Sequence, residues 1–228
     1  MTQMDMFRFT GFDGIEIQIP RGYEQRDQFG LSIKECLQRI RRFPTGDILL
    51  NQIKHAVPLA VSPTIADSPA VRNLQFDISI NVIIMPTVVR YMQSGYMEVF
   101  GEMVESSSSG HNPPRAAFWR RAGTGAHTEA LDTEAASRPG IGSKAVITFS
   151  NAQMSSSIET PPFIVLAHEL IHAVHHLYGY RWDGQEEDRT TGTGNFDGGR
   201  SGRGPGIRPL LSENELRREA GLPIRRSY

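Results

Sequence analysis

Cysteine is almost absent from this sequence, which has only Cys36 among its 228 residues. A single thiol cannot form an intrachain disulfide, so the small secreted domains that disulfides hold together are excluded. Cys36 follows Ser32 and Ile33 in a helical pattern, and single thiols on helices usually serve packing. We therefore interpret Cys36 as a packing residue and not as a nucleophile.

Long apolar runs are also missing. No segment approaches the roughly 20 consecutive apolar residues of a membrane helix, so we expect no insertion into a membrane. Residues Met1 to Phe9 lack the positive region and following apolar run that are typical of a Sec signal peptide. We expect a protein of a reducing, cytosol-like compartment, and export by a specialised secretion machine remains open.

The sequence has no excess of charge of either sign. Its 24 basic and 25 acidic residues give a formal net charge of -1, which offers no electrostatic reason to expect a nucleic-acid partner. The hydrophobic fraction of 39%, with 22 glycines and 14 prolines, indicates a folded core that carries long loops. The length is sufficient for one domain with a real core.

Alternation and spacing of apolar residues indicate the first elements of the chain. Phe7–Phe9 and Ile15–Ile19 flank a Gly-Phe-Asp-Gly turn, a pattern that predicts a β-hairpin. Apolar residues at helical spacing predict a helix over Tyr23–Arg42, and Asp47 is positioned to cap a second, short helix after it.

The middle of the chain predicts a small sheet interrupted by loops. Leu74–Met85 and Ala145–Phe149 have the composition of strands, and Val88–Val104 has the spacing of an amphipathic helix. Residues 105–143 are rich in Ser, Gly and Pro and predict a long loop. Residues 190–209 are rich in glycine and predict a second flexible stretch.

We expect one domain over residues 1–228. Its N-terminal part, residues 1–104, holds the hairpin, helix and strand, followed by the loop of residues 105–143 and a C-terminal part, residues 144–228. The predicted fold class is α+β, in which a small twisted sheet packs on the helix expected between Thr160 and Gly179. The strand before that helix could offer its edge to an extended peptide chain.

One helix carries the residues that point to chemistry. Thr160 is positioned as its cap, Pro161 falls in its first turn and Gly179 ends it. Inside lies His168-Glu169-Leu170-Ile171-His172, and residues four apart lie on the same face of a helix. His168 and His172 can therefore bind one Zn²⁺, and Glu169 beside them can take a proton from the attacking water. The motif predicts a zinc metalloprotease with one zinc per chain. We therefore expect a single zincin-like metalloprotease domain in which residues 144–228 form the zinc-site part and the sheet packs on the helix that bears the metal ligands.

A catalytic zinc site needs a third protein ligand. No histidine follows His176, so the third ligand should be a carboxylate, while His175 and His176 are interpreted as supporting or surface histidines. The carboxylate candidates are Asp183, Glu186, Glu187, Asp188, Asp197, Glu213, Glu215 and Glu219.

The helix and the segment Glu186-Glu187-Asp188-Arg189-Thr190-Thr191-Gly192 resemble the core of clostridial neurotoxin light chains. The resemblance implies a gluzincin-type site in which Glu187 is the third zinc ligand and Glu186 supports the site from behind. Those proteases also use an arginine and a tyrosine at Arg-x-x-Tyr spacing to stabilise the oxyanion. The matching pair here is Arg225 and Tyr228, although spacing alone leaves Arg226 open as the working arginine.

The chain also resembles the NleD-like type III secreted effector zinc metalloproteases of enteric and plant-associated bacteria. The resemblance covers Pro161 to Tyr228 and includes the short length of the chain, the helix, the Glu186–Glu187 pair and the C-terminal ending. It implies delivery by a type III system into the host cytosol, with a secretion chaperone among the expected partners. The implied host protein substrate is a stress-activated MAP kinase, cut in its activation loop.

Two other functions are compatible with the sequence. One is a zinc-binding effector that captures a host protein without cutting it, and the intact Glu169 argues against it. The other is a housekeeping bacterial metallopeptidase, against which nothing in the sequence decides.

Overall fold

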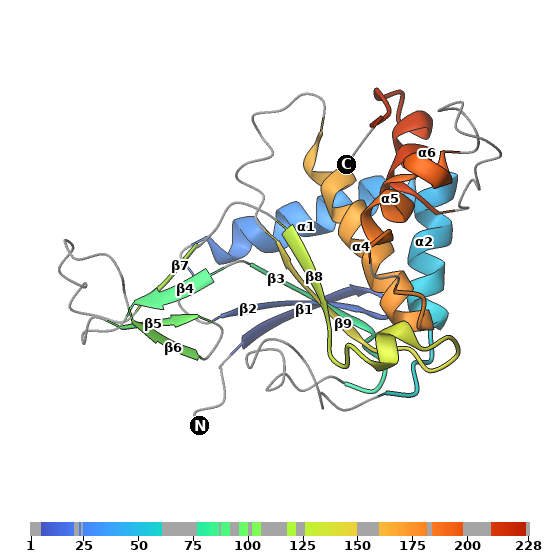
Figure 1. Ribbon diagram of the computed structural model, residues 1–228. Coiled ribbons are helices and arrows are strands. Elements are labelled where there is room, and N and C mark those ends of the chain that lie inside the picture. The colour runs from blue at the N-terminus through green and yellow to red at the C-terminus, as the bar shows by residue number, and fades with distance from the viewer. Residues whose placement is uncertain are drawn as a thin grey trace.

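The computed structural model describes residues 6–20, 23, 25–60, 77–86, 88–91, 96–99, 102–105, 118–121, 126–149, 160–181, 184–197 and 211–226. Over these residues the chain combines helices with a mixed β-sheet, which confirms the predicted α+β fold class. The helices lie mainly on one side of the larger sheet, and a smaller sheet stands beside it (Figure 1).

A five-stranded sheet forms the centre of the fold, in the order β1-β2-β3-β9-β8. Its strands are β1 (Met6–Phe12), β2 (Ile15–Pro20), β3 (Val82–Pro86), β9 (Ala145–Phe149) and β8 (Ala126–Ala130). β1 and β2 form the predicted hairpin, β2, β3 and β9 run parallel, and β8 runs antiparallel to β9. Every residue of β3 is buried, as expected for a central strand that is covered on both faces.

Two helices follow the hairpin, as the apolar spacing predicts: α1 (Arg26–Arg41) and α2 (Pro44–His55). α2 begins at Pro44 after Phe43, so Asp47 lies in its first turn and is not the predicted cap. Proline suits this position because the first turn of a helix does not need its N–H as a donor.

The single thiol packs against the hydrophobic core from α1. Burial raises the pKa of Cys36 to about 12, so the thiol stays protonated at neutral pH. A protonated thiol is a poor nucleophile, which supports its interpretation as a packing residue.

The long helix α4 (Pro162–Tyr178) contacts β8 and β9 as well as α1 and α2. Nearly all of its side chains are buried, which explains why apolar residues surround the polar motif within it. Gly179 ends the helix in the left-handed region, at φ 74°. A Cβ atom on Gly179 would lie 1.8 Å from the carbonyl oxygen of Arg138, so only glycine fits there.

The predictions for the middle of the chain are wrong in several places. Only the end of the strand expected over Leu74–Met85 forms a strand, which is β3. Residues 78 and 79 form a turn, and residues 74–76 lie outside the described residues. The helix expected over Val88–Val104 is replaced by strands β4 (Val88–Tyr91), β5 (Tyr96–Val99) and β6 (Glu102–Glu105). These pair with β7 (Phe118–Arg121) in a second, antiparallel sheet of order β6-β5-β4-β7.

The long loop expected over residues 105–143 contains regular structure. Besides β7 it includes β8, the edge strand of the main sheet, and the short 3₁₀ helix η1 (Ala135–Ser137). The Ser- and Gly-rich composition hides these strands because each is only four or five residues long.

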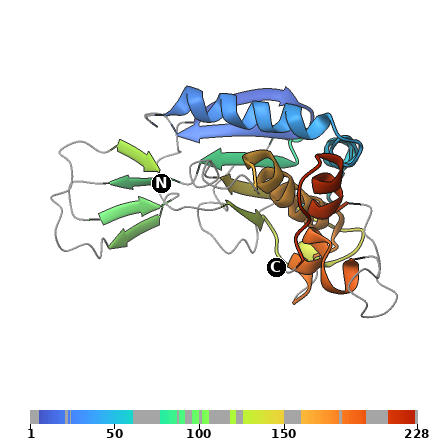
Figure 2. The ribbon, with the colours of Figure 1, turned by 90° about the horizontal axis from the view of Figure 1, so that it is seen from above.

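The C-terminal part adds α5 (Glu186–Thr191), the 3₁₀ helix η3 (Gly194–Phe196) and α6 (Glu213–Glu219). The start of the flexible stretch expected over 190–209 is therefore helical, and residues 198–209 lie outside the described residues. α5 and α6 lie at the end of the molecule away from the second sheet (Figure 2). None of the helices described has the length and apolar character needed to cross a membrane.

Candidate metal centre

Helix α4 places two imidazoles side by side. His168 and His172 are one helical turn apart, and both are buried. Their rings meet edge to face with centroids 4.7 Å apart, and their Nε2 atoms lie 3.1 Å from each other. Two nitrogen donors therefore converge on one point, as the sequence motif predicts.

Helix α5 brings a carboxylate to the same point. Oε2 of Glu187 lies 3.1 Å from His168 Nε2, and Oε1 lies 3.3 Å from His172 Nε2. Ligand atoms bonded to zinc at about 2.0–2.1 Å in a tetrahedron lie about 3.3 Å from each other. The spacing of His168, His172 and Glu187 therefore fits one zinc ion.

The same three side chains shift one another's protonation. Burial lowers the pKa of His172, but hydrogen bonds to Glu186 and Glu187 outweigh burial and raise this pKa to about 9. Burial raises the pKa of Glu187, and the hydrogen bonds to His168 and His172 reverse that shift and lower it well below its usual range. A metal needs neutral imidazoles, so metal binding at this point competes with protons.

Each histidine is held from behind by a carboxylate. His168 Nδ1 lies 2.9 Å from Glu213 Oε2, and His172 Nδ1 lies 3.1 Å from Glu186 Oε1. The hydroxyl of Thr190 lies 3.3 Å from the same His172 nitrogen. Such contacts at Nδ1 leave Nε2 free to bind a metal, and carboxylate support of this kind is common behind histidine ligands.

A second group, made of His172, His175 and Glu186, also gathers ligand atoms. Oε1 of Glu186 lies 2.5 Å from His175 Nδ1, which is a short hydrogen-bond distance and is too close for two ligands of one zinc ion. Glu186 therefore links His172 to His175 by hydrogen bonds, and this group does not fit a second zinc.

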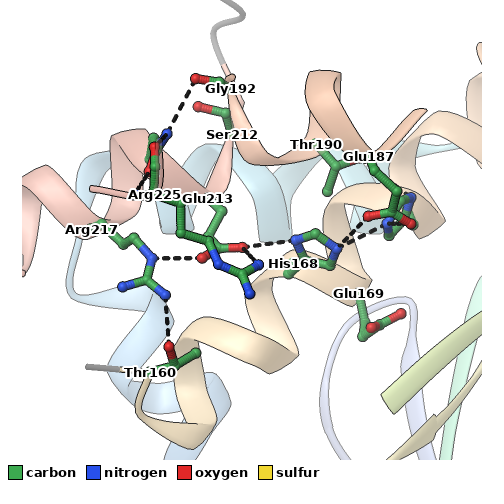
Figure 3. A network of polar contacts seen from close by, with 12 residues as sticks. Thr160, His168, Glu169, Glu187, Thr190, Gly192, Ser212, Glu213, Arg217 and Arg225 are labelled. Carbon is green, nitrogen blue, oxygen red and sulfur yellow. Dashed lines mark hydrogen bonds and ion pairs between the residues drawn. The ribbon is translucent and has the colours of Figure 1, made fainter. Parts of the chain in front are cut away.

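Helix α6 supplies a buried network behind His168 (Figure 3). Glu213 accepts from Nε of the fully buried Arg217 at 2.5 Å, and Nη1 of Arg225 lies 3.3 Å from Oε2 of Glu213. Arg217 also donates to the hydroxyl of Thr160 at 3.0 Å. Thr160 is therefore an acceptor for Arg217 and not the predicted helix cap, a position that Pro161 occupies.

Glu169 lies in a cavity of about 320 Å³ between α4, α5 and the edge strand β8. His168, His172 and Glu187 line the same cavity, together with residues 126–130 of β8. Thr128 donates to Oε2 of Glu169 at 2.6 Å. The cavity thus holds the predicted base next to the metal-binding triangle.

The strand before α4 does not have a free edge, because β9 pairs with β3 on one side and β8 on the other. β8 ends the sheet, and within the described ranges no strand pairs with its outer edge. The edge available to an extended chain at the cavity is therefore that of β8, which corrects the expectation for β9.

The other predicted residues are placed differently. Arg225 contacts Glu213 and does not line the cavity, and Tyr228 lies outside the described residues. His176 is buried, and burial lowers its pKa to about 3, so it is neutral. Among the remaining carboxylate candidates, Glu219 bonds Thr45 and Asp188 bonds Thr193, while Asp183 lies outside the described residues.

Two residues of this arrangement have no clear signal in the sequence. Glu213 is one of the eight candidate carboxylates there and, with Glu215 on the next likely helix, the alternative to Glu187 as third ligand. Thr128 falls in a segment interpreted as a loop. A helix cap at Ser212, which accepts from the N–H of Glu215, is the local feature that marks the start of α6.

One known protein family matches most of the chain. The Peptidase_M91 family, described as "Effector protein", matches residues 20–228. The chain belongs to this family. The Peptidase_M91 match includes the whole metal-binding triangle, Glu169 and the carboxylates that support the histidines. A search of curated proteins found no match to the sequence.

Solved structures whose backbones partly resemble this one include light chains of botulinum neurotoxins. The serotype HA light chain is 18% identical with a TM-score of 0.41, covering 75% of this chain and 47% of that chain. The type G light chain is 18% identical with a TM-score of 0.40, covering 75% and 45%. This Peptidase_M91 member thus spans less than half the length of these light chains.

Proposed function

We propose that this chain is a zinc-dependent endopeptidase that acts as an effector inside host cells. The observation that carries the proposal is the triangle of His168, His172 and Glu187, with Glu169 beside it in one cavity. Membership in a peptidase family described as effector proteins supports both parts of the proposal.

Each residue has a distinct role in this mechanism. His168, His172 and Glu187 hold the zinc, and Glu213 and Glu186 keep the two imidazoles oriented. A bound zinc would polarise the scissile carbonyl and make a water molecule more acidic. Glu169 takes a proton from the attacking water and passes it to the amine that leaves.

The substrate enters as an extended chain along β8. In the part of the chain that the structure describes, no strand covers the outer edge of β8, so its main-chain donors and acceptors beside Glu169 could pair with an added strand. Such main-chain pairing holds a peptide with little dependence on its sequence, so selectivity would come from side chains around the cavity.

Delivery and substrate are the finer parts of the proposal. The resemblance to NleD-like effectors supports delivery by a type III system into the host cytosol and a stress-activated MAP kinase as substrate, cut in its activation loop. The resemblance to clostridial neurotoxin light chains supports Arg225 and Tyr228 as groups that stabilise the oxyanion during hydrolysis.

Detection of new protein N-termini in host cells tests the proposal. Cells expressing the native chain are compared with cells expressing Glu169→Ala, which retains the metal ligands and lacks the base. We expect a small set of new N-termini with the native chain alone, including one in a MAP kinase activation loop. Identical N-termini with both proteins would reject proteolysis, and cleavage of an unrelated host protein would reject the kinase as substrate.

A further inference from the structure

We propose that Thr128 is the positioning residue of Glu169, fixing one carboxylate oxygen so that the other accepts the proton. The inference rests on the proposed function of Glu169 as the base. Thr128 lies on the edge strand β8, and its hydroxyl is buried against α4. Its Oγ1 lies 2.6 Å from Glu169 Oε2 and 3.0 Å from the carbonyl oxygen of Glu169.

A hydroxyl has a single proton to donate, and both of these neighbours are acceptors. The ionised carboxylate is the stronger acceptor, and the shorter distance to Oε2 agrees with a charge-assisted hydrogen bond. Thr128 therefore holds Oε2 and leaves Oε1 as the oxygen that takes the proton. Within the described parts of the chain, Thr128 is the one residue that hydrogen bonds the Glu169 side chain.

The carbonyl oxygen of Glu169 gives the hydroxyl a second acceptor. When Glu169 has gained a proton, it is neutral and its hold on the hydroxyl weakens. The hydroxyl can then turn to the carbonyl oxygen, 3.0 Å away, without being left unpaired in a buried place. Thr128 keeps its own proton throughout, and the proton that Glu169 takes from water is the one that it later passes to the leaving amine.

A residue that merely packs β8 against α4 would need the shape of threonine and not its hydroxyl. Valine has nearly the same shape and lacks the hydroxyl, whereas serine keeps the hydroxyl and lacks the methyl group. The two substitutions therefore separate packing from positioning. Thr148 on the adjacent strand β9 is the matched control, because its hydroxyl contacts the carbonyl of His127 and not Glu169.

The kinetic test uses zinc-loaded protein and a peptide that spans a cleavage site mapped with the native chain. We expect Thr128→Val to lower kcat by about 10- to 100-fold, the range for residues that orient an active-site group, with KM and zinc content unchanged. Thr128→Ser should recover kcat to within a few-fold, and Thr148→Val should match the native chain. The proposal would be overturned if Thr128→Val kept the native kcat, or if it lost zinc or failed to fold. It would also be overturned if Thr128→Ser lost as much kcat as Thr128→Val.

Crystal structures of the native chain and Thr128→Val provide a test that needs no activity. We expect the Oγ1–Oε2 hydrogen bond in the native chain and a displaced Glu169 carboxylate in Thr128→Val, with α4 and β8 unmoved. An unchanged carboxylate would overturn the positioning role. If the native chain cleaves no peptide while this displacement occurs, the proposed function fails and the geometric role of Thr128 stands.

Discussion

Nδ1 of His168 lies 2.9 Å from Oε2 of Glu213, and Nε2 of the same ring lies 3.1 Å from Glu187. The two nitrogens point to opposite sides of the imidazole, so Glu213 contacts the side away from the metal-binding triangle. A carboxylate at Nδ1 favours the tautomer that carries its proton there and keeps the lone pair of Nε2 for a metal. Helix α6 thus sets the orientation of a residue 45 positions earlier in the chain.

Glu213→Gln should weaken zinc binding by about 10- to 100-fold, because the ligand would be less firmly oriented and less basic. Zinc affinity is measured by competition with a chelator. Glu219→Gln is the control on the same helix, because Glu219 bonds Thr45 and not a histidine. Unchanged affinity in Glu213→Gln would show that the contact behind His168 does not tune the site.

Glu187→Ala should lose most of its zinc, whereas Glu186→Ala should weaken zinc binding much less and mainly lower turnover. Glu187 faces Nε2 of both histidines, while Glu186 contacts Nδ1 of His172 and His175. Zinc content and cleavage are measured in the same preparations. If Glu213→Ala removes zinc and Glu187→Ala does not, Glu213 is the third ligand and Glu187 is not.

Tyr228→Phe and Arg225→Ala should lower turnover by about one to three orders of magnitude with zinc retained, the range for loss of an oxyanion donor. Arg226→Ala is the matched comparison, since the spacing of residues leaves either arginine as the working group. Arg225 also contacts Glu213, so zinc affinity is measured for each variant. Native turnover after truncation of the chain beyond Pro223 would rule out a role for the tail.

Gly142→Ala should destabilise the fold far more than Gly140→Ala. Both glycines have positive φ, at 67° and 82°, so the backbone strain is similar, on the order of 1–2 kcal/mol. A Cβ on Gly142 would lie 1.9 Å from the carbonyl oxygen of Leu177, whereas nothing lies within 4 Å of one on Gly140. We expect a difference of about 2 kcal/mol or more in the free energy of unfolding, measured in urea. Equal losses would mean that the end of α4 does not pack closely here.

The sequence predicts the centre of the fold better than its periphery. The length of α4, its end at Gly179 and its metal-ligand spacing follow from local rules, since each concerns residues within a few turns. The pairing of β3 with β9 joins two strongly apolar segments, and such segments are readily recognised as strands.

The wrong predictions concern short strands whose sequences have the apolar spacing of a helix or the composition of a loop. Tyr91, Met92, Val99 and Met103 fall at helical spacing, but Tyr91, Val99 and Met103 belong to three different strands, β4, β5 and β6, so that spacing is accidental. Thr128 and Glu169 are 41 residues apart in the sequence, so no local sequence pattern predicts their contact. Such contacts depend on the assembled tertiary fold and not on either segment alone.

The central claim is that the triangle holds zinc and that Glu169 performs proton transfer without holding the metal. The most direct test measures zinc content and cleavage of a host protein in the same preparations of the native chain and of Glu169→Gln. Glutamine keeps the size of the side chain and an acceptor for Thr128, but it cannot take up the proton. We predict one zinc per chain in both proteins and cleavage by the native chain alone. Cleavage by Glu169→Gln at the native rate would contradict the account.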